Sequence, residues 1–321
     1  MGTILVTGAA GQIGSELVLA LRQRYSAEQV IATDIRLPAL QAASTAGPIE
    51  LLDCTKLDQV QAVVRRNGVT TIYHLAAMLS AVAEEKPQAA WDLNMGGLYH
   101  MLEAARQYRC AVFFPSSIGA FGASTPRQNA PQDTVQRPTT MYGVSKVAGE
   151  LLADYYAQRF GVDVRGLRLP GLISYVAPPG GGTTDYAVEI FYQAIRYRHY
   201  TCFLRSDTTL DMMYMPDAIS AILQLMEADA SKLAHRNAFN VTAMNFAPEQ
   251  LAAEIKKHIP DFRIEYEIDP LRQGIADSWP RSVDDSAARK EWGWAPRYTL
   301  ETMTKDMLDK LGARLKPARQ A

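Results

Sequence analysis

Three polar side chains in the middle of the sequence have the types and spacing needed to move a proton. Tyr142 and Lys146 are four residues apart, and Ser117 ends an apolar run before them. In a helix over about residues 143–160, the i, i+4 spacing puts the phenol and the ammonium on one face. A nearby positive charge favours the phenolate and lowers the tyrosine pKa. We therefore predict Tyr142 as a general base, with Lys146 and Ser117 beside it.

A glycine-rich turn near the start of the chain has the form of a dinucleotide site. Gly8, Gly11 and Gly14 follow the apolar run 4–7 and precede a helical pattern at 15–25. Residues without a β-carbon let the backbone approach a pyrophosphate, and the helix N-terminus supplies N–H groups and a positive dipole. We predict cofactor contacts at Gly8, Gly11, Gln12, Ile13 and Gly14. The alternative is a glycine turn that binds nothing.

Two acidic residues at strand ends refine the cofactor. Asp34 ends the run Val30–Asp34, about twenty residues after the glycines, where a carboxylate binds ribose hydroxyls and repels a 2′-phosphate. NAD is therefore favoured over NADP, although Arg36 lies close enough to keep NADP open. Asp53 closes the third strand, where its acid or a neighbouring amide could reach the adenine. The alternative for each acid is a helix cap or an exposed loop position.

Small residues after the fourth strand complete the predicted cofactor set. Leu75, Ala76 and Ala77 follow His74, and their size would let the cofactor lie close to the backbone. Together, the proton-transfer residues and the dinucleotide site predict hydride transfer that uses a nicotinamide cofactor. Tyr142 and Lys146 are expected to contact that cofactor as well.

Short apolar runs alternate with helical periodicity through the first half of the chain. This alternation predicts an α/β fold, a Rossmann-type doubly wound parallel sheet. The predicted strands are 4–7, 30–34, 49–53, 71–76, 111–116 and 164–169, and the predicted helices are 15–25, 56–67, 87–108 and 143–160.

The character of the sequence changes after Pro170, where a loop rich in glycine and proline occupies residues 178–184. We predict an NAD-binding Rossmann domain made of residues 1–169 with 209–244. A smaller, discontinuous substrate-binding lobe would combine residues 170–208 with 245–321. No internal repeat is present.

Composition excludes several classes of function. The 321 residues are 48% hydrophobic and 21% charged, and their formal net charge of −1 gives no reason to expect nucleic acid or an anionic membrane as partner. The three cysteines are too widely spaced for a disulfide framework or a thiolate metal site, and the histidines show no metal-binding spacing. No apolar run is long enough to span a bilayer, and the first strand begins too early for a signal peptide. We expect a cytoplasmic protein without a metal.

The segments identified above resemble the extended short-chain dehydrogenase/reductase family, which includes nucleotide-sugar epimerases and dehydratases. The likeness covers essentially the whole chain and lies in the glycine turn 8–14, residues 74–77, Asn94, Ser117, Tyr142, Lys146, and the segments 284–289 and 292–294. Within the family, segments 115–122, 168–174, 181–187 and 212–218 most resemble the short-chain threonine dehydrogenases. Nucleotide-sugar enzymes usually carry an asparagine and a YGP-like turn in place of residues 170–174, and this departure counts against a sugar nucleotide.

The resemblance implies oxidation of the β-hydroxyl of L-threonine to 2-amino-3-oxobutanoate, with Tyr142 as base. It implies that Lys146 holds the nicotinamide ribose, that Ser117 orients the hydroxyl and that Asn94 keeps a water for proton relay. Plain helix hydrogen bonding is an equal alternative for Asn94. By the same resemblance, Ser80, Thr184 and Trp279 surround the amino-acid end of the substrate. A loop cap for Ser80 and a place in the core for Trp279 remain alternatives.

Two rival functions and one assembly remain to be tested. The scaffold could serve a nucleotide-sugar epimerase or dehydratase, or a non-catalytic NAD-binding regulator. A regulator has no need of the Ser117, Tyr142 and Lys146 set, which speaks against it.

The helical segments 87–108 and 143–160 carry apolar residues on more than one face. One face must cover the sheet, and the other predicts a homodimer.

Overall fold

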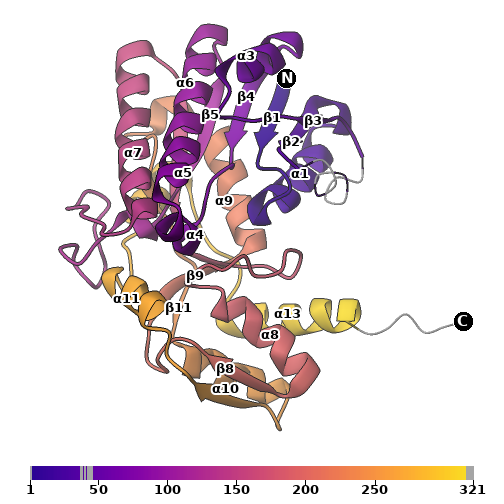
Figure 1. The fold of residues 1–321 in the computed structure, drawn as a ribbon, viewed down its shortest axis with the longest axis vertical. Helices are drawn as coiled ribbons and strands as arrows, with labels where there is room; N and C mark the ends of the chain where they lie inside the picture. The colour runs from indigo at the N-terminus through magenta and orange to yellow at the C-terminus, as the bar shows by residue number, and fades with distance from the viewer. Residues whose placement is uncertain (1, 37–38, 40, 42–45, 316–321) are drawn as a thin grey trace, which may run out of the picture.

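A seven-stranded parallel sheet is the centre of the computed structural model, with the strand order β10-β6-β5-β4-β1-β2-β3 (Figure 1). The structure describes residues 2–36, 39, 41 and 46–315. The strands are β1 (Thr3–Thr7), β2 (Val30–Asp34), β3 (Ile49–Leu51), β4 (Val69–His74), β5 (Ala111–Ser117), β6 (Val164–Leu169) and β10 (Phe239–Asn240). The strand order reverses between β1 and β4, so a crevice forms at the carboxyl ends of these strands. The predicted doubly wound α/β fold is confirmed.

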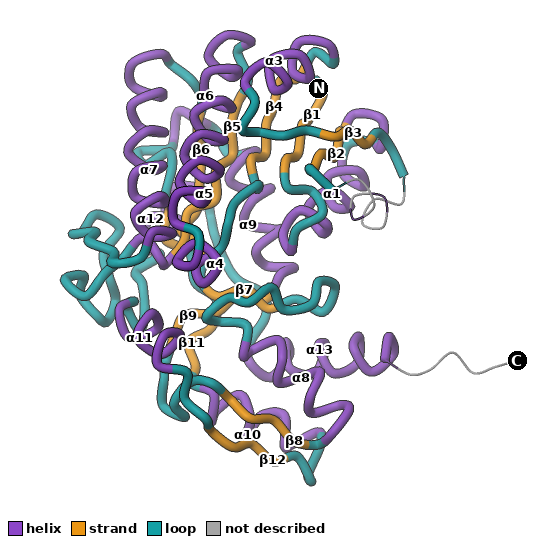
Figure 2. The backbone as a smooth tube through the Cα atoms, in the orientation of Figure 1, coloured by secondary structure: helices purple, strands orange, loops and turns teal. Residues whose placement is uncertain are grey.

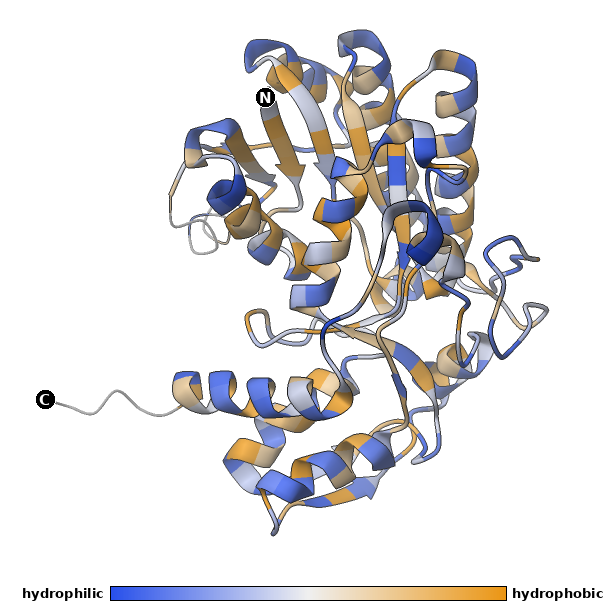
Figure 3. Ribbon diagram, turned by 180° about the vertical axis from the view of Figure 1, so that it is seen from behind, coloured by the Kyte–Doolittle hydropathy of each residue, from blue (hydrophilic) through white to orange (hydrophobic). Residues whose placement is uncertain are grey.

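Helices cover both faces of this sheet, so its inner strands are buried on both sides. Every residue of β2 and β6 is buried. One face is covered by α3 (Leu57–Arg66), α6 (Gly97–Tyr108) and α7 (Met141–Phe160), and the other by α1 (Gln12–Arg24) and α9 (Met215–Glu227). Figure 2 shows these helices around the sheet, and Figure 3 shows hydrophobic residues concentrated along its strands.

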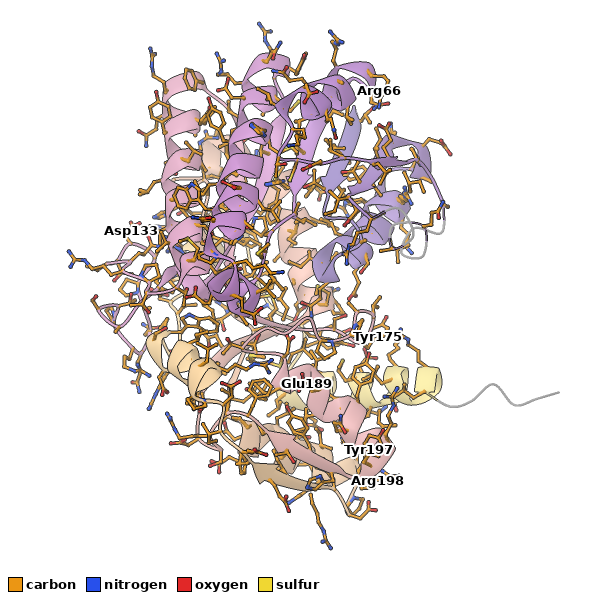
Figure 4. All side chains as sticks on the ribbon, viewed as in Figure 1. Arg66, Asp133, Tyr175, Glu189, Tyr197 and Arg198 are labelled. Atoms are coloured by element: carbon orange, nitrogen blue, oxygen red, sulfur yellow. The ribbon has the colours of Figure 1, made fainter. Side chains whose placement is uncertain are left out.

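The second part of the molecule has two small sheets and its own core. One sheet has the order β11-β9-β7, and the other pairs β12 with β8. These strands are β7 (Gly171–Ile173), β8 (His199–Cys202), β9 (Leu210–Tyr214), β11 (Met244–Phe246) and β12 (Arg263–Tyr266). The helices packed with them are α8 (Tyr186–Tyr197), α10 (Pro248–His258), α11 (Pro270–Ser278) and α13 (Leu300–Leu315). In Figure 4, Glu189, Tyr197 and Arg198 mark α8 and its C-terminal end in this lower part.

Short elements complete the described chain. They are α4 (Ser80–Glu85), α5 (Pro87–Trp91), α12 (Ser286–Trp292), the 3-10 turns η1 (Ala27–Gln29), η3 (Ile118–Ala120) and η4 (Ala230–Lys232), and the π-helical turn η2 (Asp92–Gly96). Within the described residues, none of the helices has the length and apolar character needed to cross a membrane.

The structure differs from the predicted elements in several places, among them β4, which lies at Val69–His74 rather than at residues 71–76, and the strands of the second part, which were not predicted. β3 ends at Leu51 rather than at residue 53, because the carboxylate of Asp53 accepts hydrogen bonds from the backbone and hydroxyl of Thr55 and turns the chain. The predicted helix 87–108 is divided into α5, η2 and α6 by the π-helical turn. β10 was not predicted, since a two-residue strand has no readable periodicity.

The chain passes several times between the two parts, because α9 and α12 pack in the upper part between segments that belong to the lower one. After β9 in the lower sheet, α9 packs against α1 and β6 of the upper part. Residues 1 and 316–321, at the ends of the two predicted regions, lie outside the described residues. The division into an NAD-binding domain and a substrate lobe stays a prediction.

Candidate active site

A cleft lies at the carboxyl ends of β4 and β5 and is closed on its other side by residues of the second part. It brings together predicted residues from seven separate segments of the chain. Its lining includes Gln12, Ile13, Leu75, Ala77, Ser80, Ser117, Tyr142, Lys146, Thr184 and Trp279. The structure therefore gathers the predicted proton-transfer residues and the predicted substrate residues around one space.

Helix α7 positions the tyrosine and the lysine. It begins at Met141, and the hydroxyl of the preceding Thr140 caps it by accepting a 3.1 Å hydrogen bond from Gly143 N–H. Tyr142 is thus fixed in the first turn. The ammonium of Lys146 lies 5.4 Å from the centre of the Tyr142 ring. Both side chains line the cleft, as the i, i+4 spacing predicted.

Strand β5 supplies the partners of this pair. Ser117 is its last residue, and the Ser117 hydroxyl oxygen accepts a 3.0 Å hydrogen bond from Gly119 N–H. The Lys146 Nζ donates a 2.7 Å hydrogen bond to the carbonyl oxygen of Pro115. The Lys146 ammonium also lies 4.8 Å from the centre of the Phe114 ring. Lys146 is therefore bound to the strand that ends in Ser117.

Burial dominates the titration of both groups. It raises the pKa of Tyr142 above its ordinary value, and a hydrogen bond with Ser117 opposes this effect. Burial also lowers the pKa of Lys146 to about 8, against the attraction of Glu150. The expected lowering of the Tyr142 pKa by the lysine charge does not overcome desolvation in this structure. Desolvation thus disfavours the charged form of both groups.

Asn94 lies behind this pair on the π-helical turn η2. Its side-chain oxygen accepts a 2.8 Å hydrogen bond from Met78 N–H. Its amide nitrogen donates to the Met78 carbonyl and to the Ser145 hydroxyl, each at 3.2 Å, and that hydroxyl donates to the Tyr142 carbonyl. π-helical turns are frequent at functional sites because they redirect a side chain. Asn94 also lines a small cavity shared with Lys146, but its predicted part in a proton relay stays a prediction.

His74 is a packed histidine. Its Nδ1 lies 2.8 Å from the Thr7 hydroxyl, and burial lowers its pKa to about 3, so the ring is neutral.

A second hollow lies at the glycine turn, with Gly8, Gly11, Asp34, Arg36, Leu75, Ala76 and Ala77 in its wall. Gly8 has a φ of +65°, and a β-carbon there would come within 2.7 Å of the Ala76 nitrogen. A β-carbon at Gly14 would lie 2.3 Å from the Gly8 carbonyl oxygen. Helix α1 begins here without a side-chain cap or an acidic residue in its first turn, which leaves its N-terminus open to an anion. These residues fit the pyrophosphate of a dinucleotide.

The two acids near this hollow differ in placement. Asp34 is buried, accepts 3.2 Å hydrogen bonds from Ala10 N–H and Arg36 N–H, and lies 3.5 Å from the Arg36 Nε. The Arg36 side chain is thereby directed toward Asp34, and this ion pair makes Arg36 less available to bind a 2′-phosphate. Asp53 binds Thr55, and the flanking Leu52 and Cys54 line the hollow instead. The adenine contact of Asp53 stays a prediction.

The predicted substrate residues lie on three elements around the cleft. Ser80 is the first residue of α4, and Trp279 follows α11. Both are buried. Trp279 belongs to the core of the lower part and also lines the cleft, so the core position and the predicted cleft position are both occupied by this one side chain. Thr184 lies in the loop before α8.

Sequence reasoning missed Thr183, the neighbour of Thr184. Thr183 is 1% exposed and lines the cleft, and its hydroxyl has no hydrogen-bond partner among the described residues. Asp185 shapes this loop by accepting hydrogen bonds of 2.7 Å and 2.8 Å from the N–H groups of Gly181 and Gly182. The sequence does not indicate which of the two threonine hydroxyls is buried, because side chains in a loop do not point inward and outward with a fixed period.

Comparison with known proteins identifies the family. Residues 4–242 match the NAD dependent epimerase/dehydratase family. The chain belongs to this family. The NAD predicted from the glycine turn and Asp34 is confirmed as the cofactor of the family to which the chain belongs.

The most similar proteins extend over nearly the whole chain. An uncharacterized epimerase/dehydratase of Staphylococcus haemolyticus is 57% identical over 308 residues, which are 96% of this chain and 97% of that protein. The structure of L-threonine dehydrogenase from Clostridium difficile is 56% identical, with a TM-score of 0.96 and 98% of each chain covered. A monomeric L-threonine 3-dehydrogenase from a metagenome is 43% identical, with a TM-score of 0.93, over 98% of this chain and 100% of that one. The resemblance to threonine dehydrogenases of this family is confirmed.

Proposed function

We propose that this member of the epimerase/dehydratase family is an NAD-dependent L-threonine 3-dehydrogenase. It would oxidise the β-hydroxyl of L-threonine and form 2-amino-3-oxobutanoate, NADH and a proton. The observation that carries the proposal is the meeting of Ser117, Tyr142 and Lys146 with the Thr183–Thr184 loop and Trp279 in one cleft. Similarity to solved threonine dehydrogenases over nearly the whole chain supports the same substrate.

The residues of this chain divide the reaction between them. Tyr142, as phenolate, takes the proton of the β-hydroxyl, and the Ser117 hydroxyl orients that oxygen as it becomes a carbonyl. Lys146 keeps a positive charge near the phenolate and holds the nicotinamide ribose. The glycine turn and Asp34 hold the pyrophosphate and the adenosine ribose. When bound, NAD supplies the hydride acceptor.

The amino-acid end of threonine requires a few well-placed polar groups. Ser80 and Thr184 would meet its carboxylate and ammonium, with the unpartnered Thr183 hydroxyl available beside them. Trp279 excludes water from one wall, which strengthens each hydrogen bond inside. A small substrate offers little remote binding energy, so these few contacts must decide specificity.

The experiment is an assay of NADH absorbance with purified protein, NAD and L-threonine. NADH formation that requires threonine supports the proposal. Interconversion of a nucleotide sugar without net NADH would instead identify an epimerase. Binding of NAD without turnover of threonine or of any nucleotide sugar would identify a regulator.

We also propose that the chain forms a homodimer and acts in the cytoplasm. The dimer would use α7 and the neighbouring segment α5–α6, where large apolar side chains are exposed. One structural neighbour, the metagenomic L-threonine 3-dehydrogenase, is described as monomeric, so light scattering on this protein is the test of the dimer.

A further inference from the structure

A buried ion pair lies directly behind the proton-transfer residues. Glu150 follows Lys146 by one helical turn on α7, and Arg168 lies on β6 next to the strand that ends in Ser117. The Arg168 Nε and Nη2 donate to the two Glu150 carboxylate oxygens at 3.0 Å and 2.8 Å. Glu150 is 3% exposed and Arg168 is 6% exposed. Two charges removed from water at this place are costly unless every hydrogen bond is made.

The pair is also bound to the strand that holds the catalytic residues. The Ser116 hydroxyl donates to Glu150 Oε1, and Gln136 Nε2 donates to Glu150 Oε2 at 2.9 Å. Ser116 stands between Pro115, whose carbonyl accepts from Lys146, and Ser117. One carboxylate on α7 is therefore tied to the strand end that faces Tyr142 and Lys146.

The guanidinium is equally fixed on its far side. Arg168 Nη1 donates to the Gln132 carbonyl at 2.7 Å and to the Asn240 side-chain oxygen at 3.1 Å. The Asn240 amide donates in turn to the carbonyls of Ala130 and Asp284, each at 3.2 Å. The Arg168 guanidinium is thus fixed beside Glu150, because moving it would break its hydrogen bonds to Gln132 and Asn240.

We propose that Glu150, held by Arg168, is a positioning residue for the reaction: through Ser116 it fixes the end of β5 against α7, and it keeps a negative charge one turn from Lys146. This inference rests on the proposed function for its kinetic readout. Loss of the carboxylate would shift Ser117 and the Pro115 carbonyl relative to Tyr142 and Lys146. It would also remove the attraction of the Glu150 carboxylate for the Lys146 ammonium, which opposes the lowering of the Lys146 pKa by burial.

The test compares Glu150→Gln, Arg168→Met and the variant with both substitutions. Each single variant leaves an uncompensated polar partner, so its melting temperature should fall. The double variant removes both charges, and its melting temperature should recover most of that loss. Its kcat should stay between about ten- and a hundredfold below that of the parent, with KM for NAD unchanged, because small displacements of reacting groups have effects of this size. Return of kcat together with stability would reduce the pair to a structural role and overturn the proposal.

Ser116→Ala isolates the link to the strand, because it leaves Glu150 and Arg168 in place. We expect a lower kcat at a nearly unchanged melting temperature, and an unchanged kcat would overturn the proposal. Asp163→Asn is the matched control. It breaks the ion pair of Asp163 with Arg165, which lies at the opposite end of β6, and it should leave kcat unaltered.

A titration that needs no substrate separates this inference from the proposed function. Phenolate absorbance of the protein minus that of its Tyr142→Phe variant reports ionisation beside Lys146. Glu150→Gln removes a negative charge from α7 and leaves the buried Arg168 cation uncompensated behind the phenol. Both changes favour the phenolate, so the midpoint in Glu150→Gln should move to lower pH. Titratable or charged groups on α7, on elements packed against it and in the cavity walls are the same in both proteins: His74 on β4, Glu84 on α4, Asp92 on η2, Glu103 on α6, Arg168 on β6, Asp154 on α7 and Asp185 before α8.

An unmoved midpoint would refute the proposed charge effect of Glu150. If the parent protein forms no NADH from threonine, the proposed substrate fails, and this titration still decides the role of Glu150.

Discussion

The Lys146 ammonium donates a 2.7 Å hydrogen bond to the carbonyl oxygen of Pro115, two residues before Ser117. This contact joins helix α7 to the end of β5 and places the cation beside the Tyr142 ring. Tyr142 is therefore held between a serine from the strand and a lysine from its own helix. The first prediction concerns this tyrosine.

Tyr142→Phe should bind NAD nearly as the parent does and lose turnover of threonine by at least about a hundredfold, as expected for loss of a general base. Burial of the ring is unchanged by the substitution, so the fold should persist. Fluorescence titration with NAD and the NADH assay measure the two effects. Turnover close to that of the parent would remove Tyr142 from the mechanism.

Activity should rise with pH through the mildly alkaline range. Burial raises the pKa of Tyr142 above its ordinary value, so little phenolate is present at neutral pH. The phenolate needed for proton abstraction becomes more populated as the pH rises. The pH dependence of kcat checks this. A flat profile between pH 6 and pH 9 would show that this ionisation does not limit the reaction.

The cofactor should be NAD rather than NADP, because the buried Asp34 carboxylate would meet a 2′-phosphate with like charge. Asp34→Ser should raise the ratio of kcat/KM with NADP to that with NAD, and it also frees Arg36 from its ion pair. The additional Arg36→Ala substitution should cancel part of that gain. A parent enzyme that prefers NADP would contradict this assignment of Asp34.

Thr184→Ala should depress kcat/KM for threonine while sparing NAD. Losing one hydrogen bond to a charged group costs roughly 1.5–3 kcal/mol, which is about ten- to a hundredfold in specificity. Thr183→Ala tests the neighbouring hydroxyl in the same assay. Thr299→Ala, at an exposed turn before α13, serves as the control for a threonine change away from the cleft. Equal kinetics for Thr184→Ala and the parent would place the substrate elsewhere.

The homodimer should form through α7. Val144, Leu151 and Tyr155 share one face of this helix, and Leu151 and Tyr155 are 66% and 53% exposed. Trp91 and Tyr99 add exposed aromatic surface on the adjoining segment. Light scattering should report a dimer at micromolar concentration, and Leu151→Glu should convert it to monomer. Leu271→Glu, at a leucine 54% exposed on α11, should not. A monomeric parent would refute the dimer.

Local spacing determined much of what the sequence revealed. The glycine turn, Asp34 at the end of β2, and the Tyr142–Lys146 pair each depend on neighbours in the chain, and strand and helix periods preserve such relationships. Alternating apolar runs likewise predicted the sheet, because strands buried on both faces are rich in apolar residues. The family resemblance added the predicted substrate residues, including Ser80 and Trp279, on segments far from the glycine turn.

Tertiary structure decided what depends on burial and on contacts between distant segments. It showed that desolvation raises the Tyr142 pKa despite the nearby lysine, and that Ser116 binds a buried carboxylate. It also separated the apolar residues of two helices into buried ones, such as Leu98, and exposed ones, such as Leu151. Residue type and spacing do not specify these outcomes, because the dielectric environment and the partners of a side chain are set only when the elements pack.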